Sequence, residues 1–357
     1  MDIIDTTKAY EAWAHAIHPL IGKDLALKHR RMKEAPFLFL RATYYHWAAS
    51  WAGLCPDLAG APKVMSIGDL HVENFGTWRD GEGRLAWGVN DFDEAWRLPY
   101  AHDLVRLAAS VRLARAGGQM RIGGGAACAA ILDGYATAMK RGSGQPFVLE
   151  EDNGWLRDLA MGEARDPAVF WKKLLKAAPI SDKAMKDLLA AELPGQAKPG
   201  KLKHRQAGLG SLGRQRFLLL GDWCGAKVAR EAKRLYPSAN AWANNATGSD
   251  SHFAALAASA VRARDPSLKV TGGWVIRRLA PHCLNIPLAD FPRRCEETQL
   301  LTAMGAETAN VHLGQPGQAR AISADLAKRP EGWLNVAART MADRVAEDWE
   351  RWRRRGS

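Results

Sequence analysis

Cysteine is scarce in this sequence, and its arrangement argues against two classes of protein. Five of the 357 residues are cysteines, they lie far apart, and none belongs to a CxxC pair. A disulfide-rich secreted scaffold and a zinc site built on paired thiols are therefore not expected. An odd, scattered set favours reduced thiols and a cytoplasmic protein. These residues are Cys55, Cys128, Cys224, Cys283 and Cys295.

Long apolar runs are also missing. No hydrophobic segment approaches the roughly 20 residues that cross a membrane, and residues 1–5 (MDIID) are acidic where a signal peptide is basic. The sequence contains no internal repeat and no low-complexity segment. We expect a cytoplasmic globular protein without a membrane partner, long enough for one large domain or two lobes.

Acidic residues are outnumbered by basic ones. Lysine and arginine total 50 and aspartate and glutamate 38, so the formal net charge is +12. Such a surface attracts nucleotides, phosphorylated metabolites or nucleic acid. Part of the excess is local, in residues 198–205 and 351–355. A solvated basic surface and a specific polyanion site both account for these clusters.

Two short polar segments are the most informative part of the chain. Residues 68–76 (GDLHVENFG) contain Asp69, followed five residues later by Asn74. Residues 89–94 (VNDFDE) contain Asp91 beside apolar neighbours. A phosphotransferase needs this set: one carboxylate orients an attacking hydroxyl, and an amide and a second carboxylate hold magnesium.

The stretch between these two segments predicts a β-hairpin. Residues 79–84 (RDGEGR) are rich in turn-forming residues, and they separate the apolar runs 75–78 and 85–89. A hairpin brings the two ends of such a stretch to the same edge. We therefore expect the two polar segments to lie side by side.

The polar segments carry a family resemblance. Residues 69–74 (DLHVEN) resemble the H-G-D-x-H-x-x-N catalytic loop of aminoglycoside phosphotransferases and other protein-kinase-like enzymes, and residues 91–93 resemble their I-D-F-D magnesium-binding segment. With residues 37–41 (FLFLR) and 101–107 (AHDLVRL), the combination more closely resembles a bacterial family of uncharacterised proteins, over most of the chain. One departure is Ile67, which stands where those enzymes have a largely architectural histidine.

The resemblance implies a role for each polar residue. Asp69 would accept or orient the proton of the acceptor hydroxyl, unless it only caps backbone amides. Asn74 would ligate magnesium through its amide oxygen, unless it only forms a turn. Asp91 would bridge magnesium to nucleotide phosphates, and Asp93 would be a second ligand or a support for the loop. Asp103, on the following helix, would brace the catalytic loop.

Residues 208–213 (GLGSLG) are a candidate for the phosphate-binding loop of a nucleotide site. Gly208, Gly210, Ser211 and Gly213 precede an apolar strand. Glycines there let a hairpin backbone approach phosphates and present N–H groups to them. A Rossmann turn would instead follow a strand and open a helix, so the glycine-rich hairpin of kinases fits better.

A kinase-like hairpin should be followed by a strand that carries a phosphate-pairing lysine. The resembling family usually reads K-E-A followed by P-S, and Lys233 lies five residues before Ser238. Lys233 is therefore the first candidate, Lys227 the second and Arg230 a weaker third. By strand alternation Lys227 and Lys233 project to the same face.

The remaining pattern predicts where helices and strands lie. Helices are expected over 5–50, after Pro99, through 125–192, and at 292–313 and 333–352, with strands inside 63–95 and at 216–220, 226–232 and 274–279. The polar stretch 194–205 is the best candidate boundary.

Together with the resemblance, this pattern predicts an α+β, protein-kinase-like two-lobed fold. Residues 1–195 would be a mostly helical large lobe with the catalytic loop and metal-binding hairpin, 196–290 a small β-rich nucleotide-binding lobe, and 291–357 helices that return to the large lobe. The catalytic loop precedes the glycine loop, the reverse of ordinary kinases. Because helix 304–313 resembles the one that normally leads into that loop, we expect a circular permutation.

The leading expectation is an ATP- and Mg²⁺-dependent phosphotransferase that acts on a hydroxyl of a small molecule or protein. Nucleotidyl transfer would use the same groups. One alternative is a catalytically weak nucleotide-binding regulatory module, that is, a pseudokinase. A metallophosphoesterase is another, but the G-N-H-E type segment that it needs is missing. A nucleic-acid binder rests on charge alone.

Overall fold

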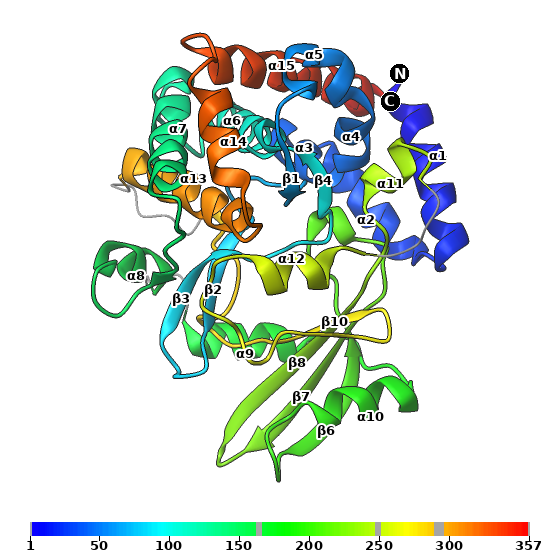
Figure 1. Cartoon of the computed structure of the whole chain (residues 1–357). Helices are drawn as coiled ribbons and strands as arrows, with labels where there is room; N and C mark the ends of the chain where they lie inside the picture. Colours follow the sequence, from blue (N-terminus) through cyan, green and yellow to red (C-terminus); the bar gives the residue numbers. More distant parts are fainter. Residues whose placement is uncertain (1, 162–165, 247–250, 289–295, 356–357) are drawn as a thin grey trace.

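Helices gather at one end of the molecule and a β-sheet forms the other, with short strands between them (Figure 1). The computed structural model describes residues 2–161, 166–246, 251–288 and 296–355. Residues 166–234 and 269–279 are called the sheet body below, and the other described residues the helical body. The mixed α+β class is as predicted. No helix in the described ranges is long and apolar enough to cross a membrane.

The helical body contains most of the hydrophobic core. Its helices are α1 (Ile3–Ile17), α2 (Gly22–Met32), α3 (Pro36–Ala42), α4 (Tyr44–Leu54), α5 (Pro56–Ala59), α6 (Tyr100–Ala116), α7 (Gly124–Arg141), α8 (Gly154–Ala160), α11 (Ala239–Ala243), α12 (Phe253–Ser259), α13 (Glu297–Leu313), α14 (Gln318–Leu326) and α15 (Trp333–Arg354). The helix predicted after Pro99 is α6, and Pro99 is its N-cap residue.

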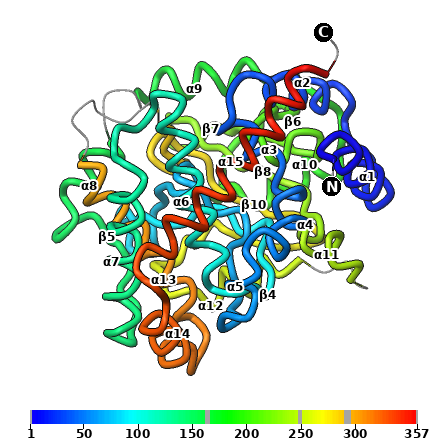
Figure 2. The backbone as a smooth tube through the Cα atoms, turned by 90° about the horizontal axis from the view of Figure 1, so that it is seen from above, coloured from blue at the N-terminus to red at the C-terminus, as the bar shows by residue number. Residues whose placement is uncertain are grey.

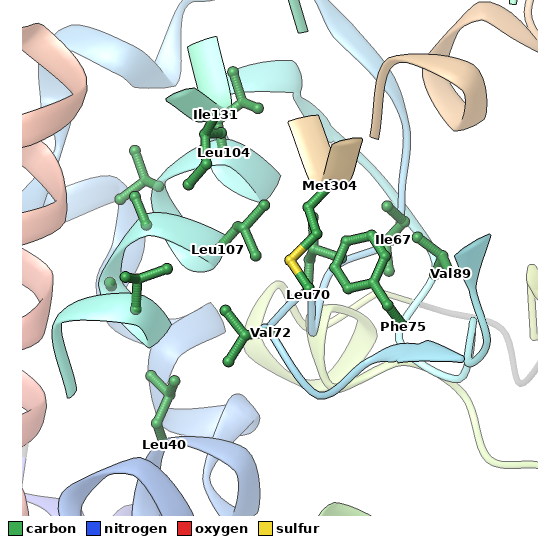
Figure 3. Close-up of a cluster of buried hydrophobic side chains, with 14 of the residues drawn as sticks. Leu40, Ile67, Leu70, Val72, Phe75, Val89, Leu104, Leu107, Ile131 and Met304 are labelled. Atoms are coloured by element: carbon green, nitrogen blue, oxygen red, sulfur yellow. The ribbon is translucent and has the colours of Figure 1, made fainter. Parts of the chain in front are cut away.

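Helix α6 is central, because fourteen of its seventeen residues are buried. Helix α15 crosses it on one side (Figure 2). On the other side α7 and α13 pack closely, since a Cβ at Gly134 would overlap the Thr302 carbonyl and one at Gly305 the Ile131 carbonyl. Figure 3 shows Leu107 of α6 and Met304 of α13 near Leu70. The loop that contains Asp69 is thereby anchored in the core.

The helical body also contains short strands. Strand β1 (Lys63–Ser66) pairs with β4 (Trp96–Pro99), and β3 (Leu85–Val89) pairs with both β2 (Phe75–Arg79) and β5 (Phe147–Val148), all antiparallel. The predicted hairpin is therefore present, with Phe75 opposite Val89 and Arg79 opposite Leu85.

The sheet body is an antiparallel sheet with a helix on each face. Its strands follow the order β6-β7-β8-β10-β9. They are β6 (Lys198–His204), β7 (Arg216–Trp223), β8 (Ala226–Arg234), β9 (Lys269–Thr271) and β10 (Trp274–Arg278). Helix α10 (Lys183–Ala191) packs on one face through Leu189, and α9 (Pro167–Leu175) on the other through Leu174.

The boundary stretch 194–205 is not a linker. It contains β6, which pairs with β7 although three of its seven residues are lysines. Its polar composition predicted a boundary, but an edge strand with one face exposed to solvent has an equally polar composition. Packing also places α9 and α10 with the sheet rather than with the helices before residue 161.

Candidate functional site

The loop that carries Asp69 is held by a carboxylate from α6. Asp103 accepts hydrogen bonds from the backbone N–H groups of Ile67 (2.7 Å) and Gly68 (2.9 Å), so the predicted brace is present. His312 of α13 lies 3.0 Å from the same carboxylate. Gly68 has φ +83°, and a Cβ there would overlap the Glu94 carbonyl. Residues 67–74 and 90–94, which meet here, are called the floor below.

Asp69 points into the site and is held by a buried arginine. Arg106 donates to Asp69 Oδ1 from Nη2 at 2.5 Å and from Nε at 3.2 Å, and to the Leu40 carbonyl at 2.8 Å. Its guanidinium also stacks on Tyr44 and Trp47. Burial raises the pKa of Asp69, and the positive charge of Arg106 opposes that rise. The side chain is thus oriented and more basic than an exposed carboxylate.

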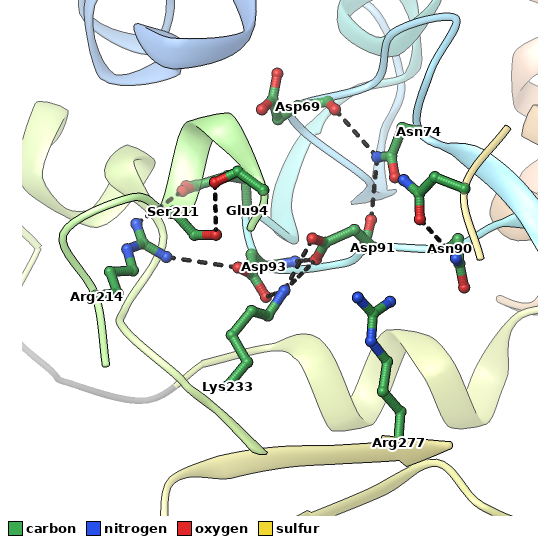
Figure 4. Close-up of polar contacts among 12 residues, drawn as sticks. Asp69, Asn74, Asn90, Asp91, Asp93, Glu94, Ser211, Arg214, Lys233 and Arg277 are labelled. Atoms are coloured by element: carbon green, nitrogen blue, oxygen red, sulfur yellow. Dashed lines mark hydrogen bonds and ion pairs between the residues drawn. The ribbon is translucent and has the colours of Figure 1, made fainter. Parts of the chain in front are cut away.

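Asn74 links the two segments of the floor. Its amide nitrogen donates to the backbone carbonyls of Asp69 (3.1 Å) and Asp91 (3.2 Å), shown as dashed lines in Figure 4. Its amide oxygen is buried and has no hydrogen-bond partner among the described residues. A buried oxygen without a donor is costly, unless a cation or ligand donor completes it.

Asp91 and Asp93 face a lysine from the sheet body. Lys233 of β8 lies 2.8 Å from Asp91 Oδ2 and 2.6 Å from Asp93 Oδ1 (Figure 4), and only 5% of its side chain is exposed. Burial raises the pKa of Asp91, but the charge of Lys233 and the hydrogen bonds from Lys233 and Asp93 together outweigh burial, so the net pKa is lowered. Burial and the neighbouring Asp91 charge raise the pKa of Asp93 to about 6.

The glycine loop connects two neighbouring strands, β6 and β7, as the hairpin prediction requires. Gly208 and Gly213 have φ values of +73° and +100°, which favour glycine. Gly210 approaches the floor so closely that a Cβ there would lie 2.9 Å from the Arg41 carbonyl and 3.8 Å from Asp69 Oδ2. Residues 208–214, together with Glu231, Lys233 and Arg277, are called the roof below.

Arg214, directly after the glycine loop, is a site residue that was not predicted from the sequence. Its Nη2 donates to the Tyr10 hydroxyl (2.9 Å) and to Glu94 (3.3 Å), and its Nη1 lies 3.6 Å from Asp93. It joins the roof to the floor and to α1. The signal available was a basic residue immediately after G-x-G-x-x-G, which is weak because the whole chain is rich in arginine.

Lys227 is not brought to the site. It occupies the exposed beginning of β8 and pairs with Asp222 at 2.5 Å. Alternation puts it on the same face as Lys233, but six residues of strand separate them by roughly 20 Å. Arg230 is not at the site either, because it is three residues from Lys233 and therefore projects from the opposite face of β8.

Two residues beside Asp69 have structural partners. His71 packs edge-on against Phe37, and burial lowers its pKa well below the usual value. Glu73 forms an ion pair with Arg41 and accepts from the Leu288 N–H at 2.8 Å. Arg41 and Arg106 thus each form an ion pair with a carboxylate next to the site, Arg41 with Glu73 and Arg106 with Asp69.

Floor and roof enclose a cavity of about 90 Å³, lined by residues that include Asp69, Asn74, Asp91, Asp93 and Gly210. Pockets that hold small ligands usually measure about 300–1,000 Å³. The structure is therefore a closed form, and a nucleotide could enter only if roof and floor separate.

The donor set of the floor suits a hard cation. It comprises two carboxylates and the Asn74 amide oxygen, and oxygen ligands of this kind bind magnesium with water and phosphate oxygens completing the shell. Within the described ranges no group of three or more His, Cys, Asp or Glu side chains is placed to hold a metal ion. A site here would thus depend on ligand oxygens.

Comparison with known proteins gives one match. Residues 21–186 match the model of a family described as an uncharacterized protein conserved in bacteria (DUF2252). The match covers slightly less than half of the chain and contains the whole floor, but it ends before the roof. The predicted likeness to an uncharacterised bacterial family is thereby confirmed. No curated protein and no solved structure matches the chain.

Proposed function

We propose that this protein is an ATP- and Mg²⁺-dependent phosphotransferase that acts on a hydroxyl of a small molecule or protein. The observation that carries the proposal is the contact of Lys233, from the sheet, with both Asp91 and Asp93. A phosphate-binding lysine opposite metal-binding carboxylates is the arrangement that phosphoryl transfer needs. The glycine loop lies close to Asp69 and, together with Asp69, Asp91 and Asp93, lines the cavity next to this contact.

The floor would hold the metal. Asn74, Asp91 and Asp93 supply its oxygen ligands, and the amide oxygen of Asn74 lacks any other partner in the described part of the chain. Bound magnesium would supply charge neutralisation at the transferring phosphoryl group. Lys233 would then exchange its carboxylate partners for phosphate oxygens, which are equally good acceptors for an ammonium group.

The roof would hold the phosphates through backbone groups as well. The N–H groups of Leu209 and Gly210 donate to no acceptor among the described residues, whereas that of Ser211 donates to the Gly208 carbonyl. Two unused N–H groups in a tight turn form a concave anion-binding surface. The two are adjacent in the chain and belong to the loop that lines the cavity.

Asp69 would act on the acceptor hydroxyl. Its carboxylate lines the cavity, and Arg106 fixes its orientation. A buried, raised-pKa carboxylate can accept the hydroxyl proton as the oxygen attacks the phosphoryl group. The charge of Arg106 opposes the rise in the pKa of Asp69 that burial causes, and so favours the ionised form that accepts the proton.

The arrangement of the chain ends supports a permuted two-lobed fold. Arg351 of α15 lies 4.0 Å from Asp2, so the first and last segments meet at the surface. Permutation joins and reopens a chain at such points. His312, at the end of α13, contacts the Asp103 carboxylate that braces the Asp69 loop. The helix expected to lead into that loop is thus adjacent to it in space.

The test separates binding from chemistry. Asp91→Ala should abolish magnesium-dependent ATP binding, while Asp69→Asn should retain binding and lose about 10²- to 10⁴-fold in turnover. Lys227→Ala, at the far end of β8, is the matched control and should change neither. Binding is measured by calorimetry and turnover by phosphate release or autophosphorylation. Wild-type protein that shows no thermal shift with ATP, ADP or GTP, with or without Mg²⁺, would refute the proposal.

A nucleotide-binding regulatory protein without catalysis is the second candidate. The closed cavity and the engagement of Lys233 by both carboxylates favour it, because the free protein must first open. Magnesium-dependent ATP binding without any hydrolysis or phosphoryl transfer, also at high enzyme concentration, would support this alternative.

A further inference from the structure

Arg277 of β10 faces the floor from the same side of the sheet as Lys233. In the antiparallel register Arg277 is opposite Glu231 and Val275 is opposite Lys233. Alternate residues of a strand project to one face, so these side chains all point toward the helical body. Figure 4 shows Arg277 rising from the sheet with its guanidinium directed toward Asp91.

Glu231 holds Arg277 in an unusual cluster. The carboxylate is completely buried, and it contacts three guanidinium groups. Arg216 Nη1 and Arg277 Nε each lie 2.9 Å from Oε1, and Arg205 forms the third ion pair. One negative charge against three positive ones leaves a local excess of positive charge, which is costly away from water unless further anions compensate it.

Arg277 has unused donors, and Figure 4 shows its guanidinium directed toward Asp91. Its Nε is used by Glu231, and its terminal nitrogens have no hydrogen-bond partner among the described residues. About 20% of the side chain is exposed, whereas Arg216 is almost completely buried. A guanidinium held by Nε presents its two Nη groups in a fixed orientation, which matches two phosphate oxygens.

Resting on the proposed function, we propose that Arg277 is a second phosphate-binding cation, which together with Lys233 makes the site selective for nucleoside triphosphates over less charged nucleotides. Glu231 positions it, and Asp91 and Asp93 supply the compensating charge in the closed form. When those carboxylates turn to a cation, Lys233 and Arg277 both face the phosphates. Each added phosphate then gains a charged donor.

The experiment compares ligands of increasing charge. Dissociation constants of adenosine, ADP, ATP and tripolyphosphate, all with Mg²⁺, are measured by calorimetry for wild type, Arg277→Met and Arg277→Lys. We expect Arg277→Met to weaken ATP and tripolyphosphate binding by about 10- to 100-fold and to leave adenosine binding unchanged. Arg277→Lys should recover part of the lost affinity, because lysine restores the positive charge but not the paired Nη donors of the guanidinium.

Arg278→Met is the matched control. Arg278 is the next residue on the same strand, but it contacts Ser267 and Asp265 rather than the cluster. It should bind every ligand as wild type does. Equal ATP affinity in Arg277→Met and wild type would overturn the role of Arg277 but not the proposed function. A loss of affinity that is the same for ATP and adenosine would do the same. Wild-type protein that binds none of the four ligands overturns the proposed function itself.

Discussion

The floor and the roof of the site are stabilised in different ways. The floor is held by backbone groups: Asp103 binds the N–H groups of Ile67 and Gly68, and Asn74 binds two carbonyls. The roof is held by charge, with arginines around Glu231 and Lys233 bound to the floor. Backbone bonds fix a geometry, whereas ion pairs can exchange one anion for another. We therefore expect the floor to stay rigid and the roof to move when the site opens.

The largest loss of stability should come from removing the charge of Glu231, which neutralises the arginines of the roof. Glu231→Gln leaves Arg205, Arg216 and Arg277 buried without their common carboxylate. Breaking a buried ion pair from one side costs about 3–5 kcal/mol, measured as the free energy of unfolding in urea. The control is Asp222→Asn, whose partner Lys227 is exposed, and it should cost less than 1 kcal/mol. Equal, small losses in both variants would show that the cluster does not stabilise the roof.

A pH-dependent effect of intermediate size should come from a buried carboxylate that supports the floor. Glu307 of α13 accepts the Val89 N–H at 3.1 Å, just before the segment that carries Asp91. Burial raises the pKa of Glu307 from 4.5 to about 7, against the opposing effects of Asn310 and Arg262. The folded state therefore keeps a proton that the unfolded chain releases.

The sign follows from this difference. As pH rises from 4.5 to 7, the unfolded chain loses the proton first, so the folded protein loses stability, by at most about 1.4 kcal/mol per pH unit. Above pH 7 this contribution is constant. Glu307→Gln should remove that part of the slope in urea unfolding measured across the window. An unchanged slope in the variant would contradict the raised pKa.

The smallest effect should arise where roof and floor touch. Gly210→Ala places a Cβ 2.9 Å from the Arg41 carbonyl, so the loop must move by a few tenths of an ångström. We expect a loss of about 1 kcal/mol in unfolding free energy and weaker ATP binding. Gly195→Ala, where nothing lies within 4 Å, is the control and should be close to wild type. A Gly210→Ala protein with unchanged stability would indicate that the loop is not seated on the floor.

The elements that the sequence predicted correctly are those with strong local signals. The hairpin of β2 and β3 has a Gly- and Asp-rich turn, and α6 follows a proline that forms its N-cap. Strand β6 was taken for a boundary because its outer positions are lysines, and Lys227 was a candidate because alternation does not specify position along a strand. Arg214, Glu231 and Arg277 were not recognised as neighbours, because they meet only through sheet register and loop approach.

The polar residues of the floor could be identified from the sequence alone, since Asp69, Asn74 and Asp91 lie within one short hairpin segment whose turn brings them together. The sequence also determined which strand carries Lys233. Two features could be seen only in the folded chain: Lys233 reaches Asp91 across 142 positions, and three arginines share the Glu231 carboxylate. Local patterns encode local geometry, whereas contacts between distant segments depend on how the sheet packs on the helices.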